Sequence, residues 1–184
     1  MYPMRPQAVA YGGRLYKSLL ARRWKPVSRQ GSWAIEPKLD GMRLLSVVTS
    51  DGVRLLSRTG NLVHNVDVGR AVSGLSINWL SISGGDSRTG GFVFDGELFD
   101  GKYHIFDAPC IVGDYAYRRA WMDKNVHRFR GSVVRGMQLT CEDPWKWVMD
   151  RGHEGLVFKY IHSSYSWNKS PSSPPNPQWM KVKP

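Results

Sequence analysis

Apolar and polar residues alternate along the middle of this 184-residue chain, a pattern that is typical of β-strands with one buried face. The alternation is interrupted by Asp51-Gly52 and by Asp100-Gly101, dipeptides that favour the tight turns of β-hairpins. The sequence therefore predicts an antiparallel sheet built from two hairpins, with strands at residues 44–48, 53–57, 92–99 and 103–106.

Two helices are predicted in the second half of the chain. The first covers residues 117–135, where apolar side chains recur at near-helical spacing, namely Trp121, Val126, Phe129 and Val133. The second begins after the N-cap residue Asp143, with Pro144 at the first helical position, and it ends before Gly152. A buried strand is expected directly afterwards, at residues 154–160.

Weaker signals complete the predicted organisation. Strands are expected at residues 33–35 and 179–183, and a loop is expected at residues 163–177 because Ser, Pro and Asn dominate that stretch. We therefore expect a single α+β domain over residues 1–184, with antiparallel sheets flanked by helices.

The net charge of the chain indicates which class of partner it binds. The chain has 26 Lys and Arg against 15 Asp and Glu, a formal net charge of +11, and its first carboxylate is Glu36. The basic, acid-free segment at residues 1–32 favours binding to a polyanion such as nucleic acid, with a solvated basic face as the alternative. The candidate phosphate contacts lie in a short predicted helix at residues 14–23 and are Arg14, Lys17, Arg22 and Arg23.

Cysteine content and hydropathy exclude two other classes of protein. Two cysteines, Cys110 and Cys141, cannot build a disulfide framework, and no stretch approaches the roughly 20 apolar residues of a membrane span. We expect a protein of the reducing cytoplasm that is neither secreted nor embedded in a membrane.

A candidate reactive lysine, Lys38, lies in the segment EPKLDGMR at residues 36–43. A lysine beside an Asp-Gly turn is held rigidly, but its amine is a nucleophile only after it loses the proton that it carries at neutral pH. A nearby cation such as Arg43 disfavours the charged amine and so favours that loss. The alternative is an ordinary hairpin with Lys and Arg side chains on the surface.

Charged residues further along the chain are candidate partners for this lysine. Glu97 and Glu154 fall on two separate predicted strands, and two carboxylates near a lysine could hold Mg²⁺, although a structural salt bridge is the alternative for each. Lys181 and Lys183 alternate along the last predicted strand and share a face, where a phosphate would offset their mutual repulsion. A solvated chain end is the alternative for this pair.

Taken in order, six motifs resemble those of the covalent nucleotidyltransferases. They are Lys-x-Asp-Gly-x-Arg at residues 38–43, Ser-Arg-Thr-Gly at 57–60, Asp-Gly-Glu at 95–97, Tyr-His-Ile-Phe-Asp at 103–107, Glu-Gly-Leu-Val-x-Lys at 154–159 and Lys-Val-Lys at 181–183. With Glu36 and the Tyr-Arg-Arg stretch at 117–119, the chain is similar to the adenylation domain of ATP-dependent DNA ligases, of the small kind found in bacteriophages and other viruses. The resemblance implies an ATP-grasp-like nucleotidyltransferase core.

The resemblance also implies that the protein is a DNA ligase that uses ATP. Lys38 would attack the α-phosphate of ATP and keep AMP in a phosphoramide bond, and the other catalytic residues would be Asp40, Lys181 and Lys183. Glu97 and Glu154 would bind the ribose and Mg²⁺ or Mn²⁺. AMP would then pass to the 5′-phosphate of nicked duplex DNA, and the 3′-hydroxyl would displace it to seal the strand.

The remaining motif residues are implied to bind nucleotide and DNA. Phe106 would stack on the adenine, and Glu36 would accept a hydrogen bond from its amino group, which favours ATP over GTP. Arg43 and Arg58 would hold ribose and phosphate in the nucleotide complex and later the 5′-phosphate at the nick. The enzyme would act as a monomer in replication, recombination or repair of DNA, in a bacterium or a phage-infected host.

One departure from the family pattern leaves other functions open. In these ligases a second domain of the OB type follows the last lysine motif, whereas this sequence ends at Pro184, so we expect no OB domain in the chain. The alternatives are an RNA ligase or another covalent nucleotidyltransferase, one half of a two-chain ligase whose OB domain is a separate partner, and a DNA-binding remnant without catalysis.

Overall fold

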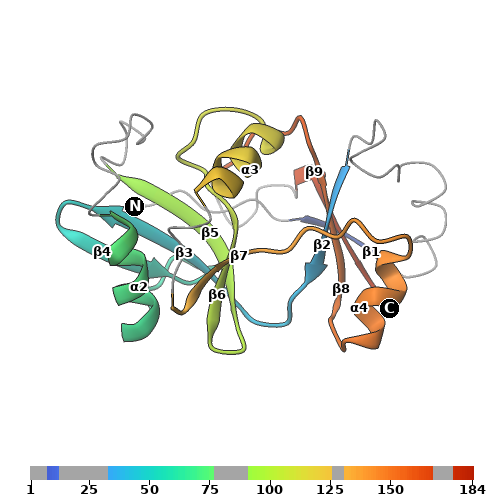
Figure 1. Cartoon of the computed structure of the whole chain (residues 1–184), viewed down its shortest axis with the longest axis horizontal. Coiled ribbons are helices and arrows are strands. Elements are labelled where there is room, and N and C mark those ends of the chain that lie inside the picture. Colours follow the sequence, from blue (N-terminus) through green and yellow to red (C-terminus); the bar gives the residue numbers. More distant parts are fainter. Residues whose placement is uncertain (1–7, 13–32, 77–90, 126–130, 168–175) are drawn as a thin grey trace. The chain divides into compact units, whose positions relative to one another are not determined.

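The computed structural model describes residues 8–12, 33–76, 91–125, 131–167 and 176–184. Its strands are β1 (Ala8–Gly12), β2 (Trp33–Lys38), β3 (Met42–Thr49), β4 (Gly52–Leu56), β5 (Phe92–Phe99), β6 (Lys102–Asp107), β7 (Val133–Arg135), β8 (Gly155–Tyr160) and β9 (Asn176–Lys183). Its helices are α2 (Val66–Ser76), α3 (Tyr115–Lys124) and α4 (Pro144–Asp150) (Figure 1). Two compact units divide these elements: the lysine unit contains β1, β2, α4, β8 and β9, and the arginine unit contains the others.

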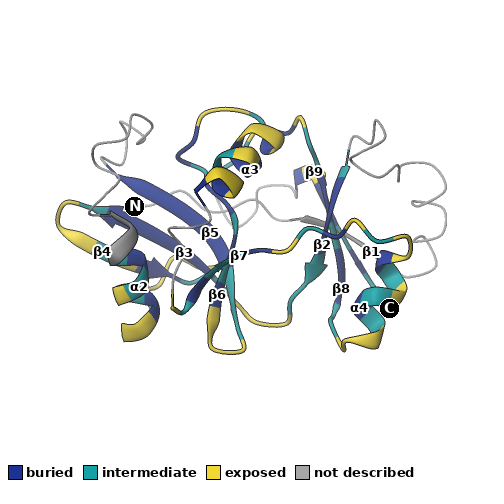
Figure 2. Ribbon diagram, in the orientation of Figure 1, coloured by how far each residue is buried: buried dark blue, intermediate teal, exposed yellow. Residues whose placement is uncertain are grey.

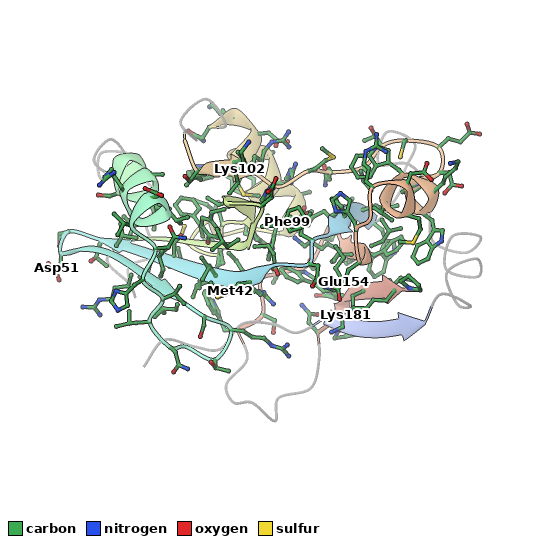
Figure 3. The ribbon with its side chains drawn as sticks, turned by 90° about the horizontal axis from the view of Figure 1, so that it is seen from below. Met42, Asp51, Phe99, Lys102, Glu154 and Lys181 are labelled. Atoms are coloured by element: carbon green, nitrogen blue, oxygen red, sulfur yellow. The ribbon has the colours of Figure 1, made fainter. Side chains whose placement is uncertain are left out.

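The arginine unit is built on a five-stranded sheet with the order β4-β3-β5-β6-β7. Its pairs are antiparallel except for β6 and β7, which are parallel. Both predicted hairpins are confirmed, with Asp51 at the tip of β3–β4 and with Phe99 and Lys102 flanking the turn of β5–β6 (Figure 3). Gly101 has a φ of +68°, which explains why an Asp-Gly dipeptide forms this turn.

Burial follows the strands of this unit, and the turns remain exposed (Figure 2). Tyr103 illustrates how the strands are tied together, because its ring is fully buried. Its hydroxyl lies 2.9 Å from the carbonyl oxygen of Phe94 on β5 and 3.1 Å from that of Leu44 on β3. The hydroxyl is thus satisfied inside an apolar core, as a buried polar group must be.

The lysine unit is built on a four-stranded sheet with the order β1-β9-β8-β2. Only the β1–β9 pair is parallel among these strands. Alternate residues of β2, β8 and β9 form a core with α4, made by Ile35, Leu139, Val148, Leu156, Phe158, Met180 and Val182. Because successive side chains in a strand point to opposite faces, the residues between them, including Glu36, Lys38, Lys159 and Lys181, belong to the other face of the sheet.

The predicted punctuation of α4 is confirmed. The Asp143 side chain accepts a hydrogen bond of 2.9 Å from the backbone N–H of Lys146, and Pro144 is the first helical residue. Gly152 follows the helix with a φ of +67°, a conformation that favours glycine. The strands expected at residues 154–160, 33–35 and 179–183 correspond to β8, β2 and β9, and β2 continues to Lys38.

The predicted helix at residues 117–135 is wrong at its C-terminal end. Helix α3 begins after its N-cap Asp114 and ends at Lys124, with Asn125 as C-cap, whereas residues 133–135 form strand β7. Gly131, with a φ of +60°, and the β-branched pair Val133-Val134 favour a turn and a strand over a continued helix. Val126 and Phe129, the other residues of the predicted apolar stripe, lie outside the described residues.

Of two further sequence predictions, one has a wrong boundary and the other lies outside the described residues. The loop expected at residues 163–177 is too long, because β9 already begins at Asn176, and Ser163 is fully buried. The basic helix expected at residues 14–23 lies outside the described residues, with its four candidate DNA contacts. Strand β1 and helix α2 were not predicted from the sequence.

Within the described part of the chain, no helix has the length and apolar character needed to cross a membrane. The observed combination of mixed sheets with few helices is the α+β class that the sequence pattern predicts.

Candidate functional site

Lys38 lies at the C-terminal end of β2, where the strand meets the beginning of β8. Its backbone is in register with Gly155, and its carbonyl oxygen accepts a 3.1 Å hydrogen bond from the backbone N–H of Glu154. Lys183 is close to the end of β9, the other neighbour of β8. The topology therefore brings one carboxylate and two amines from three separate segments to the same end of one sheet.

Glu154 joins the two lysines directly. The ammonium group of Lys38 donates a hydrogen bond to Oε2 of Glu154, and that of Lys183 donates to Oε1. Partial burial by itself would raise the pKa of Glu154, but the hydrogen bonds from Lys183 and Lys38 and their positive charges outweigh it and hold the pKa below its ordinary value. Glu154 is therefore ionised at neutral pH.

The three side chains remain accessible to a ligand. Lys38, Glu154 and Lys183 are 21%, 26% and 44% exposed. Lys181, which is in register with Val157 of β8, lies on the same face of β9 as Lys183 and is partly exposed. Glu154 and Lys181 come from neighbouring strand segments and are both labelled in Figure 3. A phosphate-bearing molecule would meet three cations here.

The backbone geometry at position 155 explains why a glycine follows Glu154 in its motif. Its φ is +138°, and a Cβ built on it would overlap the carbonyl group of Val182 on β9. Only glycine allows both this backbone conformation and the close approach of β8 to β9. That approach brings Glu154 and Lys183 within hydrogen-bonding distance.

Glu36 and Lys159 form a second ion pair on the same face of this sheet. Their charged groups are 2.8 Å apart, and the side chains are only 6% and 1% exposed. The ammonium group of Lys159 also lies 4.6 Å from the centroid of the Trp179 ring, a cation–π distance. Lys159 ends the Glu-Gly-Leu-Val-x-Lys motif, and its pairing with Glu36 was not predicted from the sequence.

In the arginine unit, Arg43 forms a bidentate ion pair with the buried Asp95. Its Nε lies 3.0 Å from Oδ1 and its Nη2 lies 2.5 Å from Oδ2. The guanidinium carbon is 5.6 Å from the centroid of the Phe106 ring. Arg43 belongs to the arginine unit and Lys38 to the lysine unit, so the predicted effect of this cation on Lys38 stays a prediction.

The remaining predicted residues have defined local positions. Glu97 is partly buried on β5, opposite Arg43 and His104. Arg58 is exposed in the turn after β4, where the Ser57 hydroxyl lies 3.2 Å from the Thr59 hydroxyl and accepts a 3.1 Å hydrogen bond from the N–H of Asn61. Asp40 is exposed just after β2.

The predicted metal pair is Glu97 and Glu154, and these carboxylates belong to different units. Within the described residues, no group of three or more His, Cys, Asp and Glu side chains gathers in a way that could hold a metal ion. Metal binding by the two glutamates therefore stays a prediction.

A second buried Asp–Arg pair, also missed from the sequence, stabilises the arginine unit. Asp107 binds Arg118 through contacts of 2.6 and 3.0 Å, and both side chains are almost completely buried. Arg118 also donates a 2.8 Å hydrogen bond to the carbonyl oxygen of Gly113. The sequence could have indicated an ion pair here, because a charged residue inside an apolar strand or helix needs a partner of opposite charge.

No protein-family model matches the sequence. Over 176 residues, the chain is 26% identical to the multifunctional non-homologous end joining protein LigD of Pseudomonas aeruginosa, an alignment that covers 84% of this chain and 20% of that protein. The chain thus spans about one fifth of this curated relative.

Solved DNA ligases share the fold. A mycobacterial DNA ligase D complexed with ATP and MES superposes with a TM-score of 0.61 at 18% identity, over 96% of this chain and 60% of the ligase. The ATP-dependent DNA ligase of bacteriophage T7, in complex with ATP, gives a TM-score of 0.60 at 16% identity, over 98% of this chain and 68% of the ligase. The chain therefore resembles the ATP-dependent DNA ligases and has the fold of their nucleotidyltransferase domain.

Proposed function

We propose that this chain is the nucleotidyltransferase core of an ATP-dependent DNA ligase. The observation that supports this function best is the cluster in which Glu154 binds both Lys38 and Lys183. It contains a partly exposed primary amine, a second cation suited to phosphate oxygens and an ionised carboxylate. Covalent transfer of a nucleotide to lysine needs each of these groups.

The first reaction would be self-adenylation of Lys38. The Lys38 amine, after losing its proton, would form a bond to the α-phosphorus of ATP, while the bond from that phosphorus to the oxygen bridging to the β-phosphate breaks. Pyrophosphate would leave, and AMP would remain on the lysine. Lys183 and Lys181 would bind the phosphate oxygens and stabilise the negative charge that develops on them.

A divalent cation fits the chemistry of the donor residues. Glu154 is ionised at neutral pH, as an oxygen ligand of Mg²⁺ or Mn²⁺ must be, and Glu97 offers a second carboxylate from β5. A bound cation would withdraw electron density from the phosphate and make its phosphorus more reactive.

Glu36 and Phe106 are the residues proposed to recognise adenine. The carboxylate of Glu36 is held in place by Lys159 and would accept a hydrogen bond from the adenine amino group, which guanine lacks. Phe106, which is partly exposed and contacts the Arg43 guanidinium, would provide the ring that stacks on the base. These contacts favour ATP over GTP.

Nicked duplex DNA would be the second substrate. Arg43 and Arg58 would bind the 5′-phosphate at the nick, to which AMP passes from Lys38 before the 3′-hydroxyl displaces it. Arg58 is exposed and therefore accessible to a DNA backbone. The predicted contacts of Arg14, Lys17, Arg22 and Arg23 would add sequence-independent binding to phosphates.

Covalent labelling tests the first reaction. The protein is incubated with α-labelled ATP and Mg²⁺, and the label that stays on the denatured polypeptide is measured. We expect label on the wild type and none on Lys38→Ala, with Lys102→Ala, an exposed lysine on β6, as the labelled control. Absence of label on the wild type, also after addition of an isolated OB domain from a related ligase, would contradict self-adenylation.

Sealing assays test the later reactions. Nicked all-DNA duplex, nicks with RNA on either side and nicks that already carry AMP are compared as substrates. We expect sealing of the DNA nick and of the pre-adenylated DNA nick. Preference for RNA would favour an RNA ligase instead, and binding of nicked DNA without label or sealing would show a non-catalytic DNA-binding module.

A further inference from the structure

Asp95 is a fully buried carboxylate in the middle of β5 that has no part in the function proposed above. It accepts two hydrogen bonds from one guanidinium, that of Arg43 on β3, at 3.0 and 2.5 Å. Two parallel hydrogen bonds of this kind fix the plane of the guanidinium as well as its position, which a single bond cannot do.

The backbone register shows that Arg43 reaches past its direct neighbour to make this pair. Arg43 faces Glu97 across the β3–β5 ladder, whereas Asp95 faces Leu45, so the ion pair is diagonal. Strand β5 is paired with β3 on one side and with β6 on the other. Because both ladders hold the backbone of Asp95, its carboxylate is a fixed anchor.

The anchored guanidinium leads to the ring of Phe106. Its central carbon lies 5.6 Å from the ring centroid, and the Arg43 side chain is 19% exposed. Carboxylate, guanidinium and ring therefore form a row that begins in the buried sheet and ends at two partly exposed side chains. A shift of the carboxylate would move the other two groups.

The second Asp–Arg pair of this unit shows what a purely structural pair looks like. Arg118 also binds its aspartate, Asp107, in a bidentate manner, but its side chain is only 1% exposed and donates a further hydrogen bond to the carbonyl oxygen of Gly113. Arg118 is thus enclosed by protein. The Arg43 guanidinium is equally well fixed, but the Arg43 side chain is 19% exposed and can be contacted by a ligand.

We propose that Asp95 is a positioning residue for nucleotide binding, which acts by holding Arg43 against Phe106. This inference rests on the proposed function, since Arg43 and Phe106 are the residues that would contact ribose, phosphate and adenine. Asp95 itself is fully buried, so it would not contact the nucleotide. Its loss would weaken binding of the nucleotide without removing any group that reacts.

Single-turnover self-adenylation of the full chain separates positioning from simple stability. We compare the wild type with two variants. Asp95→Asn keeps the side-chain size but lacks one acceptor oxygen, and Arg43→Lys keeps the charge but lacks the planar guanidinium that makes two parallel hydrogen bonds. For Asp95→Asn we expect the half-saturating ATP concentration to rise about tenfold, with the maximal rate within about threefold of the wild type, because uniform binding is lost. The double variant should be no weaker than the worse single variant, within about twofold, because Asp95 is proposed to act through Arg43.

Val47→Ala serves as the stability control, because Val47 is buried in the same strand as Arg43. It should lower the Tm without changing the half-saturating ATP concentration. Two results would overturn the inference while the proposed function stands. One is a half-saturating ATP concentration in Asp95→Asn that equals that of the wild type. The other is a double variant in which the effects of the two single variants multiply. If the wild type itself forms no lysyl-AMP, the proposed function fails first, and the inference fails with it.

Discussion

The ammonium group of Lys159 lies 2.8 Å from the carboxylate of Glu36, and both side chains are almost completely buried. The two residues come from the antiparallel pair β8 and β2. A buried charge is strongly unfavourable unless it is paired, so this ion pair stabilises both groups. The pair also places the carboxylate that is proposed to recognise adenine.

Replacement of Lys159 by Met should therefore destabilise the protein. Lys159→Met leaves the Glu36 carboxylate buried beside an apolar side chain, and we expect the free energy of unfolding in urea to fall by about 3–5 kcal/mol. Lys146→Met is the control, because Lys146 forms an exposed ion pair with Asp150 on the surface of α4, and it should have little effect. Equal stability of Lys159→Met and the wild type would show that Glu36 finds another partner.

Local sequence signals predicted the hairpins and α4 because a few neighbouring residues determine them. Asp100-Gly101 forms its turn through a positive φ at both positions, and Asp143 caps its helix through its own side chain. The prediction of a helix at residues 117–135 was wrong at its C-terminal end because the apolar Val133 is compatible with a strand as well as with the apolar stripe of a helix. Its partner Tyr103 on β6 decides between them, and that pairing is not local.

The candidate site was predictable in part for the same reason. The motifs indicated Lys38, Glu154 and Lys183, and the register of β2, β8 and β9 brings these three together. The pairing of Glu36 with Lys159 and that of Arg43 with Asp95 were not foreseen. Each joins residues from different strands, so it depends on strand order and register, which the sequence pattern does not specify.

Acid should weaken the link between Glu154 and its two lysines. Its folded-state pKa lies below the ordinary value, so its stabilising contribution is present above that value and is lost as the pH falls through the lowered pKa. In thermal melts without metal ions, we expect Glu154→Gln to have a lower Tm than the wild type at neutral pH. The difference should close as the pH falls through the lowered pKa, which lies below the ordinary glutamate value of about 4.3.

Glu142→Gln provides the control for this pH series, because Glu142 is an exposed carboxylate outside the site. Its melting curve should follow the wild type at every pH. A Tm difference for Glu154→Gln that is the same in acid and at neutral pH would mean that the side chain stabilises the protein by shape and not by charge.

Gly155 and Gly152 provide a matched test of backbone geometry. Both have positive φ values, but only at Gly155 would an added Cβ overlap the backbone of β9. We expect Gly152→Ala to cost about 1 kcal/mol of stability, as is usual for a left-handed residue, and Gly155→Ala to cost about 3 kcal/mol or more. Urea titrations of the two variants measure this difference, and similar costs would show that β9 moves away without penalty.

Lys183→Met should separate catalysis from stability in the lysine unit. Lys183 is 44% exposed, so its removal should lower the Tm no more than Glu154→Gln does, whereas the proposed reaction loses a cation that stabilises charge on the phosphate. We expect the single-turnover rate of lysyl-AMP formation to fall by about 100-fold or more.

Two further variants give this last prediction its controls. Lys102→Met removes an exposed lysine from β6 and should leave the rate unchanged, which excludes a general effect of lower net charge. Lys183→Arg keeps the charge and should retain more activity than Lys183→Met, because the phosphate needs a cation at this position more than it needs an amine. If Lys183→Met reacts as fast as the wild type, the role of Lys183 is only to neutralise Glu154. Lys181 would then be the residue that binds the phosphate.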